Sequence, residues 1–330
     1  MDSAKLSQLK QALDRLPRIP LVEMPTPVRK LARAFPGLEV WLKDDSHSHP
    51  IYGGNKPRKL EYLLARVKNK KQSVVTFGFE SSNHAVATVY HCSQHGIPCH
   101  LVLVRGPEGM APSDEALKEK KLALMRSLAT SIETVDNYPQ AARAGTRKWL
   151  LGLGKIRLIP PGGSNALGTL GYVRAALELA EQIERGELPP PKAIFVPLGT
   201  SGTAVGLAIG LAAAGLPTKV FAVKVVPGKI NELPRLRWLA RQVGKLVREL
   251  PRESLTLLNL AIEGSELGAG YGKPTKDGLR AVERWLSEEG VKLEPTYSGK
   301  AAAVLERYTG DGENLSPILF WLTYSEYRGQ

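Results

Sequence analysis

Short apolar runs alternate with segments of helical periodicity along most of the chain. The apolar positions Leu60, Leu63, Leu64 and Val67 recur at helical spacing, whereas Ser73–Phe79 is a continuous, β-branched run. Continuous runs of this kind are typical of parallel strands that are buried on both sides. The pattern predicts strands at 38–43, 73–79, 99–104, 132–135, 156–159, 193–198 and 220–225. It predicts helices around Leu6–Leu13, after Pro57, and at 85–94, 113–128, 141–150, 170–183, 204–214, 232–246 and 277–287.

This alternation implies an α/β fold in which parallel sheets carry helices on both faces. Beyond residue 261 the sequence is irregular, and only the helix at 277–287 stands out from glycine-rich loops. A chain of 330 residues can form one large domain or two ordinary ones and can bury a substantial core.

Composition and charge narrow the class of protein. A hydrophobic content of 43% and a charged content of 23% are those of a soluble globular protein. No apolar run is long enough to span a membrane, and the N-terminus lacks the apolar centre of a secretory signal. With only two cysteines, Cys92 and Cys99, a disulfide framework is not expected, and the predicted location is cytoplasmic.

The net charge of +13 could indicate a nucleic-acid partner. The basic residues are spread along the chain and interleaved with acidic ones, and no zinc-finger, RNP1-like or basic-zipper pattern is present. We therefore expect a solvated basic surface with neither a nucleic-acid nor a membrane partner. A nucleic-acid-binding role is kept as a distant alternative.

A glycine-punctuated loop places a lysine directly before a predicted helix. In Gly53-Gly54-Asn55-Lys56-Pro57 the glycines allow close backbone approach, and Pro57 fits the first helical position. Because a residue before proline is biased away from the α region, we expect Lys56 on the loop. A lysine amine held among tight backbone can lose its proton and condense with a carbonyl group as a Schiff base. Taken alone, the motif is also compatible with an ordinary solvated lysine.

Two further loops follow predicted strands and precede helices, which is where open α/β sheets bind ligands. Ser82, Asn83 and His84 offer hydroxyl, amide and backbone N–H groups suited to a substrate carboxylate, although plain N-capping would use the same groups. Gly199–Thr203, with the sequence GTSGT, can surround a phosphate with N–H groups and hydroxyls. Since this loop is neither a Walker A loop nor GxGxxG, we favour a single phosphate on a small cofactor.

Two tyrosines are candidates to face a cavity. Glycines flank Tyr271, and Tyr297 lies in the segment Tyr-Ser-Gly-Lys, although single tyrosines are usually packing residues.

A cluster of possible metal ligands carries no metal prediction. The spacing matches no standard zinc site, and we expect the two cysteines to point in unrelated directions. The cluster consists of His91, Cys92, His95, Cys99 and His100.

Taken together, the motifs resemble those of the 1-aminocyclopropane-1-carboxylate (ACC) deaminase and D-cysteine desulfhydrase family of pyridoxal-phosphate enzymes. They run in the family's order from about Pro20 to Ala301, as PTP (25–27), LKDD (42–45), GGNKPRKLEYL (from Gly53), SSNH (81–84), GGSNALGTLGYV (from Gly162), GTSGT (from Gly199), YG (271–272) and EPTYSGKA (from Glu294). The resemblance implies two open, twisted, mostly parallel sheets flanked by helices, as in fold type II. It also implies a large domain of residues 1–56 and 167–330, an inserted small domain of residues 57–166, pyridoxal 5'-phosphate (PLP) as the cofactor, and a homodimer.

The resemblance further implies roles for individual residues. Lys56 would be the Schiff-base lysine and the group that moves the α-proton, while Ser82, Asn83 and His84 would hold the substrate carboxylate. The implied catalytic residues are Lys56, Ser82, Tyr271 and Tyr297. The implied cofactor-binding residues are Lys56, Lys59, Asn83, Gly199, Thr200, Ser201, Gly202, Thr203 and Ser298.

Two positions depart from the family. Ser298 stands where the deaminase branch has a glutamate, and Ser81 stands where the family usually has glutamine. A serine can only hydrogen-bond a neutral pyridine nitrogen, which is a poorer electron sink, so α,β-elimination is favoured over opening of a cyclopropane ring.

The sequence therefore predicts a PLP-dependent carbon–sulfur lyase acting on a small D-amino acid, D-cysteine first, with pyruvate, ammonia and sulfide as products. The alternatives are ACC deamination to 2-oxobutyrate and ammonia, a serine dehydratase or racemase activity, and a PLP- or anion-binding protein without turnover.

Overall fold

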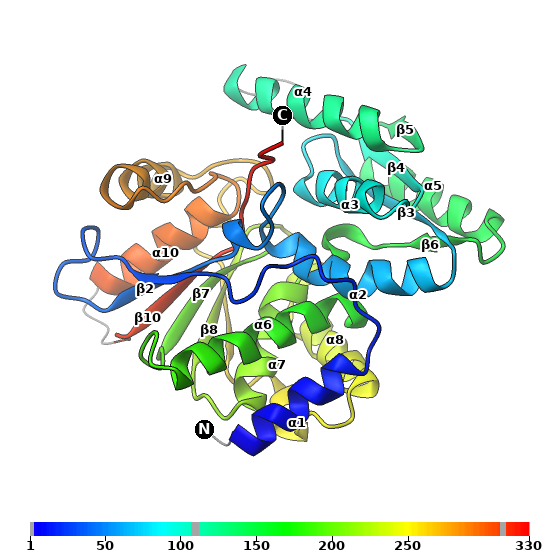
Figure 1. The fold of residues 1–330 in the computed structure, drawn as a ribbon. Coiled ribbons are helices and arrows are strands. Elements are labelled where there is room, and N and C mark those ends of the chain that lie inside the picture. Colours follow the sequence, from blue (N-terminus) through cyan, green and yellow to red (C-terminus); the bar gives the residue numbers. More distant parts are fainter. Residues whose placement is uncertain (1–2, 107–111, 311–314, 330) are drawn as a thin grey trace.

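The computed structural model describes residues 3–106, 112–310 and 315–329, and its strands form two separate sheets (Figure 1). The strands are β1 (Val28–Lys30), β2 (Val40–Asp44), β3 (Ser73–Phe79), β4 (Cys99–Val104), β5 (Ser131–Val135), β6 (Ile156–Leu158), β7 (Ala193–Leu198), β8 (Lys219–Lys224), β9 (Leu260–Glu263) and β10 (Ile318–Leu322). The α-helices are α1 (Ser3–Asp14), α2 (Asn55–Asn69), α3 (Asn83–Gln94), α4 (Pro112–Leu128), α5 (Tyr138–Leu151), α6 (Ala166–Glu184), α7 (Gly202–Ala213), α8 (Leu233–Leu246), α9 (Lys276–Glu289) and α10 (Ser298–Gly310).

The larger sheet has the strand order β1-β2-β10-β7-β8-β9, and only β1 runs antiparallel to its neighbour. Successive side chains of its strands point to opposite faces of the sheet, and each face is covered by its own hydrophobic core. Ile194 and Val196 of β7 pack in a core that also contains residues of α1, α6, α7 and α8. Phe195, on the other face, packs with α9 and α10. The predicted α/β class, with mostly parallel sheets flanked by helices, is confirmed.

The smaller sheet has the order β5-β4-β3-β6 and is entirely parallel. Helices α2, α3 and α4 share a core with one face, and α5 packs on the other face beside Phe77 and Val102. All four strands lie within residues 57–166, the segment expected to form the inserted domain. That domain division itself stays a prediction.

The C-terminal part of the chain differs most from the sequence prediction. β9, α10 and β10 all lie in the tract that was expected to be irregular apart from one helix. β10 is an inner strand of the large sheet, between β2 and β7. After β10, the chain runs toward the smaller sheet (Figure 1), and Tyr327 forms an isolated antiparallel bridge with Tyr52.

Two local predictions were wrong. Lys56 lies in the first turn of α2 rather than on a loop, because the helix begins at Asn55. Proline is tolerated there, since the N–H groups of a first helical turn have no intrahelical partner. The thiols of Cys92 and Cys99 lie next to each other instead of pointing in unrelated directions, because α3 packs directly on β4.

Candidate active site

A cavity of about 580 Å³ opens where several parallel strands end. Its lining includes Phe79 at the end of β3, Gly199 after β7, Val226 after β8 and Thr323 after β10. This is the edge at which open parallel sheets bind ligands. Because β3 belongs to the smaller sheet and the other strands to the larger one, both sheets contribute to the cavity.

Lys56 enters this cavity from a tightly held helix start. The Gly54 N–H donates to Asp45 O at 2.7 Å, and the Asn55 N–H donates to Thr323 O at 3.0 Å. Gly54 has a φ of +81°, and a Cβ there would lie 2.7 Å from Thr323 O, so only glycine fits. Burial lowers the pKa of Lys56 to about 8, although the carboxylate of Glu294 opposes the shift. An amine with this pKa can gain and lose a proton near neutral pH.

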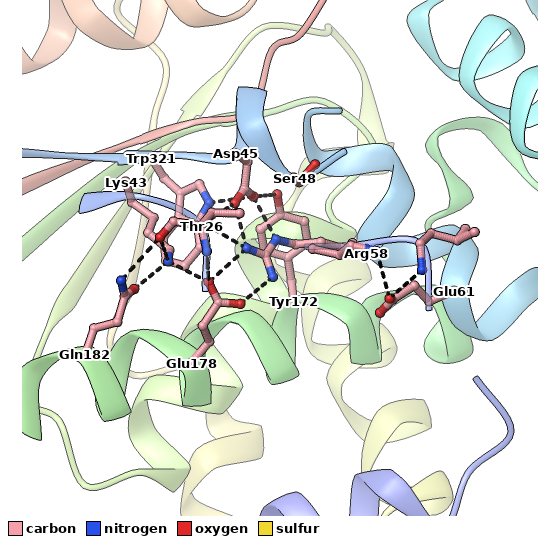
Figure 2. A network of polar contacts seen from close by, with 12 residues as sticks. Thr26, Lys43, Asp45, Ser48, Arg58, Glu61, Tyr172, Glu178, Gln182 and Trp321 are labelled. Carbon is pink, nitrogen blue, oxygen red and sulfur yellow. Dashed lines mark hydrogen bonds and ion pairs between the residues drawn. The ribbon is translucent and has the colours of Figure 1, made fainter. Parts of the chain in front are cut away.

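Next to this helix start lies a buried ionic network, drawn in Figure 2. The Arg58 guanidinium donates to both oxygens of Asp45, at 3.0 and 2.7 Å, and to Glu178 at 2.8 Å. Lys43 donates to Glu178 at 2.6 Å. Asp45 also accepts from Tyr172 and Trp321.

The charges of this network balance. Burial alone would raise the pKa of Glu178, but Arg58 and Lys43 hold it at about 2. Two cations, Lys43 and Arg58, therefore face two carboxylates, Asp45 and Glu178, and the four groups satisfy one another. Since Asp45 also holds Gly54, the network fixes the turn that precedes Lys56.

A second buried lysine has a different environment. Lys59 is 2% exposed and donates only to neutral oxygens, Gly162 O and Ser164 Oγ, both at 3.1 Å. Within the described residues, no carboxylate lies in ion-pair distance of Lys59 or Lys56. Burial, together with the charge of Lys56, holds the pKa of Lys59 well below its ordinary value.

The predicted phosphate loop, Gly199–Thr203, lies against Lys59 and runs into α7, which begins at Gly202. A Cβ at Gly202 would lie 3.2 Å from Lys59 Nζ, so the glycine leaves room beside the amine. The N–H groups of the first turn of α7 have no intrahelical acceptor and form a positive helix end. The Ser201 hydroxyl is already used, since it donates to Ile230 O at 2.8 Å.

The predicted carboxylate-binding residues form the start of α3. Ser82 is the N-cap and accepts from the Ala85 N–H at 3.3 Å, as in ordinary capping. His84 is neutral, because burial, with Lys56 and Lys59 nearby, lowers its pKa to about 3. Its ring nitrogens contact Thr76 and Thr88, so its backbone N–H is the group left for a ligand. The side-chain oxygen of Asn83 is buried without a hydrogen-bond partner within the described residues.

Tyr271 and Tyr297 both line the cavity and are bonded to each other. The Tyr297 hydroxyl donates to the Tyr271 oxygen at 2.9 Å, which leaves the Tyr271 proton free to be donated elsewhere. Burial raises the pKa of both phenols, so both are protonated near neutral pH.

Of the predicted site residues, Gly202 does not line the cavity, and neither does Ser298. Ser298 is fully buried, and its hydroxyl accepts from the Glu294 N–H at 2.8 Å. The role of Ser298 as a partner for a cofactor ring stays a prediction. The cavity residues that the sequence analysis missed include Glu294 and Thr323. Glu294 caps the start of α10, and Thr323 follows β10, so finding them required those two elements.

These residues fit a phosphate-bearing aldehyde cofactor. Within the described residues, two buried amines lack a carboxylate partner and a buried amide oxygen of Asn83 lacks any partner, and helices α3 and α7 begin at the cavity. An anion bound at the α7 end would compensate the charge of Lys59, while Lys56 would supply the amine. Among the described residues, no group of three or more His, Cys, Asp or Glu side chains could hold a metal ion. Within residues 3–106, 112–310 and 315–329, no helix is long and apolar enough to cross a membrane.

Comparisons with known proteins identify the chain's relatives. Residues 19–323 match the family model described as "Pyridoxal-phosphate dependent enzyme". The chain is 34% identical over 324 residues to a D-cysteine desulfhydrase of Serratia proteamaculans, with 94% of each chain covered. It is 32% identical to a D-cysteine desulfhydrase of Klebsiella pneumoniae, again with 94% of each chain covered.

Solved structures agree with these matches. A crystal structure described as an ACC deaminase homologue aligns with a TM-score of 0.78 and 29% identity, and the match covers 96% of this chain and 94% of that one. A PLP-dependent aspartate racemase aligns with a TM-score of 0.62 at 16% identity, which shows the shared fold alone. The chain therefore belongs to the pyridoxal-phosphate dependent enzyme family.

Proposed function

We propose that this PLP-dependent enzyme is a carbon–sulfur lyase that eliminates a β-substituent from a small D-amino acid, as D-cysteine desulfhydrase does. For D-cysteine the products would be pyruvate, ammonia and sulfide. The observation that carries the proposal is Lys56, whose amine has a pKa of about 8 and lies in a cavity with the starts of α3 and α7 and a pair of protonated tyrosines. Similarity to two D-cysteine desulfhydrases over 94% of the chain supports it.

Different residues of the chain would have different roles in the reaction. Lys56 would take the proton from Cα, since an amine with a pKa of about 8 can lose its own proton near neutral pH and then accept another. The N–H groups at the start of α3, with Ser82 and Asn83, would hold the substrate carboxylate. Tyr271 would give its free proton to the departing sulfur. When bound, PLP supplies the electron sink for the Cα carbanion.

Cofactor binding would rest on a second set of cavity residues. Lys59 and Gly199–Thr203 would hold the phosphate, with Thr200 beside the hydroxyl of Ser164 at 2.7 Å. Asn83 would contact the cofactor ring. The proposal includes the division into a large domain of residues 1–56 and 167–330 and a small domain of residues 57–166.

We also propose a homodimer located in the cytoplasm. The resemblance to the family supports the dimer, and the neighbouring thiols of Cys92 and Cys99, which are both free, suit a reducing compartment. Light scattering of the purified protein tests the oligomer.

Keto-acid release tests the reaction itself. The PLP-loaded protein is incubated in parallel with D-cysteine, L-cysteine and ACC. We expect pyruvate and sulfide from D-cysteine, and no 2-oxobutyrate from ACC. Absence of pyruvate from D-cysteine and from S-substituted D-cysteines alike would contradict the proposal.

ACC deamination is the second candidate, favoured by the alignment with the ACC deaminase homologue. Release of 2-oxobutyrate from ACC would support it. Ser298 does not by itself separate the two reactions, because its contact with the cofactor ring stays a prediction.

A further inference from the structure

A continuous wall of aromatic rings lines part of the cavity. Phe77 and Phe79 come from β3, and Tyr138 begins α5. Tyr271 lies between β9 and α9, and Tyr297 directly precedes α10. Neighbouring rings are in contact along the whole wall. The centroid distances are 5.5 Å (Phe77–Tyr138), 5.8 Å (Phe79–Tyr138), 5.3 Å (Phe79–Tyr271) and 5.8 Å (Tyr271–Tyr297).

The wall keeps apolar surface open toward the cavity. Tyr138 remains 38% exposed although it contacts two phenylalanines. Val226, Pro227 and Ile230 add further apolar lining. An aromatic ring removed from water by such a surface gains both from buried area and from ring–ring contact.

The wall also includes the proposed proton donor. Tyr271 stacks on Phe79 with an interplanar angle of 25°, and its hydroxyl carries the proton intended for the departing sulfur. A group attached to that sulfur would therefore extend along the wall. The thiol group of free cysteine is too small to use these rings.

We infer that the enzyme's preferred substrates are D-cysteine thioethers that carry an apolar, ring-bearing group on sulfur. The substrate class rests on the proposed elimination and specifies its leaving group. The α-proton goes to Lys56, the Cβ–S bond breaks with its electron pair on sulfur, and the sulfur takes a proton from Tyr271. With one water, R–S–CH₂–CH(NH₃⁺)–COO⁻ gives R–SH, pyruvate and NH₄⁺.

A comparison of kcat/KM for three substrates tests the inference on the PLP-loaded protein. Pyruvate release is measured with D-cysteine, S-benzyl-D-cysteine and S-carboxymethyl-D-cysteine, so that the third substrate separates a thioether from an apolar thioether. We expect kcat/KM for the benzyl substrate to exceed the other two by about tenfold or more, in line with the usual discrimination by apolar pockets. A higher value for D-cysteine or for the carboxymethyl substrate overturns the substrate class and leaves the elimination intact. Absence of pyruvate from all three defeats the proposed function itself.

A binding measurement gives a readout independent of turnover. D-Phenylalanine and D-alanine lack a leaving group, and their dissociation constants follow from the change in cofactor absorbance. Tighter binding of D-phenylalanine by about tenfold supports the inference, and equal or weaker binding contradicts it.

Two variants on α5 locate the effect. Tyr138→Ala removes a ring that lines the cavity, whereas Trp149→Ala removes one of similar exposure, 39% against 38%, outside the cavity lining. The preference for the benzyl substrate over D-cysteine should fall about fivefold or more in Tyr138→Ala, within the usual cost of lost aromatic contacts, and stay unchanged in Trp149→Ala. Equal behaviour of the two variants contradicts a role for the wall.

Discussion

Two neighbouring regions of the molecule bury cations in opposite ways. Lys43 and Arg58 lie in the network of Figure 2, where Asp45 and Glu178 match them charge for charge. Lys56 and Lys59, on the same helix as Arg58, have only neutral hydrogen-bond partners within the described residues. Burying an uncompensated charge is costly, whereas a balanced network is stable without any ligand. The unbalanced region is therefore the one prepared for an anionic cofactor.

Removing Lys56 should have the largest effect on function. In Lys56→Ala we expect kcat to fall roughly 10³-fold or more, because both the cofactor's amine partner and the proposed base are lost. Lys68→Ala, at the exposed end of the same helix, is the matched control and should retain full activity. Pyruvate release measures both variants. Full turnover by Lys56→Ala would remove this residue from the reaction.

Unbalancing the network should act on stability instead. Glu178→Gln leaves Lys43 and Arg58 facing Asp45 alone, which should cost about 3–5 kcal/mol of unfolding free energy. Denaturant unfolding gives the value. Glu283→Gln, at an exposed position on α9, should change it by no more than about 0.5 kcal/mol. A similarly small loss in Glu178→Gln would show that the network does not stabilise the fold.

The pH dependence of stability gives a smaller effect of predictable sign. The pKa of Lys56 is about 8 in the folded chain against an ordinary 10.5. Below pH 8 both states carry the proton and the folded state bears the full cost of the buried charge. Between about 8 and 10.5 only the unfolded state is protonated, so the cofactor-free protein should gain stability as pH rises. The unfolding free energy of the native protein, measured by denaturant at several pH values, should rise between about pH 8 and 10.5 relative to that of Lys56→Met. If the two proteins show the same pH dependence, the lowered pKa of Lys56 is contradicted.

Much of the fold was predictable because most helices and strands have a recognisable local pattern of apolar residues. β3, β4 and β7 lie at their predicted bounds, since continuous apolar runs are characteristic of buried parallel strands. β10 has a similar apolar run, Ile318–Leu322. It was missed because the regular alternation of predicted helices and strands ends well before it. α10 was missed because its residues 301–305 are buried all round, so no amphipathic period marks it.

The candidate site was predictable only in part. Lys56, Asn83 and Tyr271 could be named because each stands in a motif, and all three line the cavity. Glu294 and Phe79 reach it through the packing of distant elements. The ring contact between Phe79 and Tyr271 joins residues 192 positions apart, which no local pattern predicts.

Cofactor binding with and without the phosphate tests most directly whether the unbalanced cations serve an anion. Dissociation constants of PLP and of pyridoxal are measured by absorbance titration of the native protein and of Lys59→Met. Charge-assisted hydrogen bonds of about 1.5–3 kcal/mol each lead us to expect about 10²-fold tighter binding of PLP, with a loss of tenfold or more of that preference in Lys59→Met. Equal affinity for the two aldehydes, or an unchanged preference in the variant, would contradict the account.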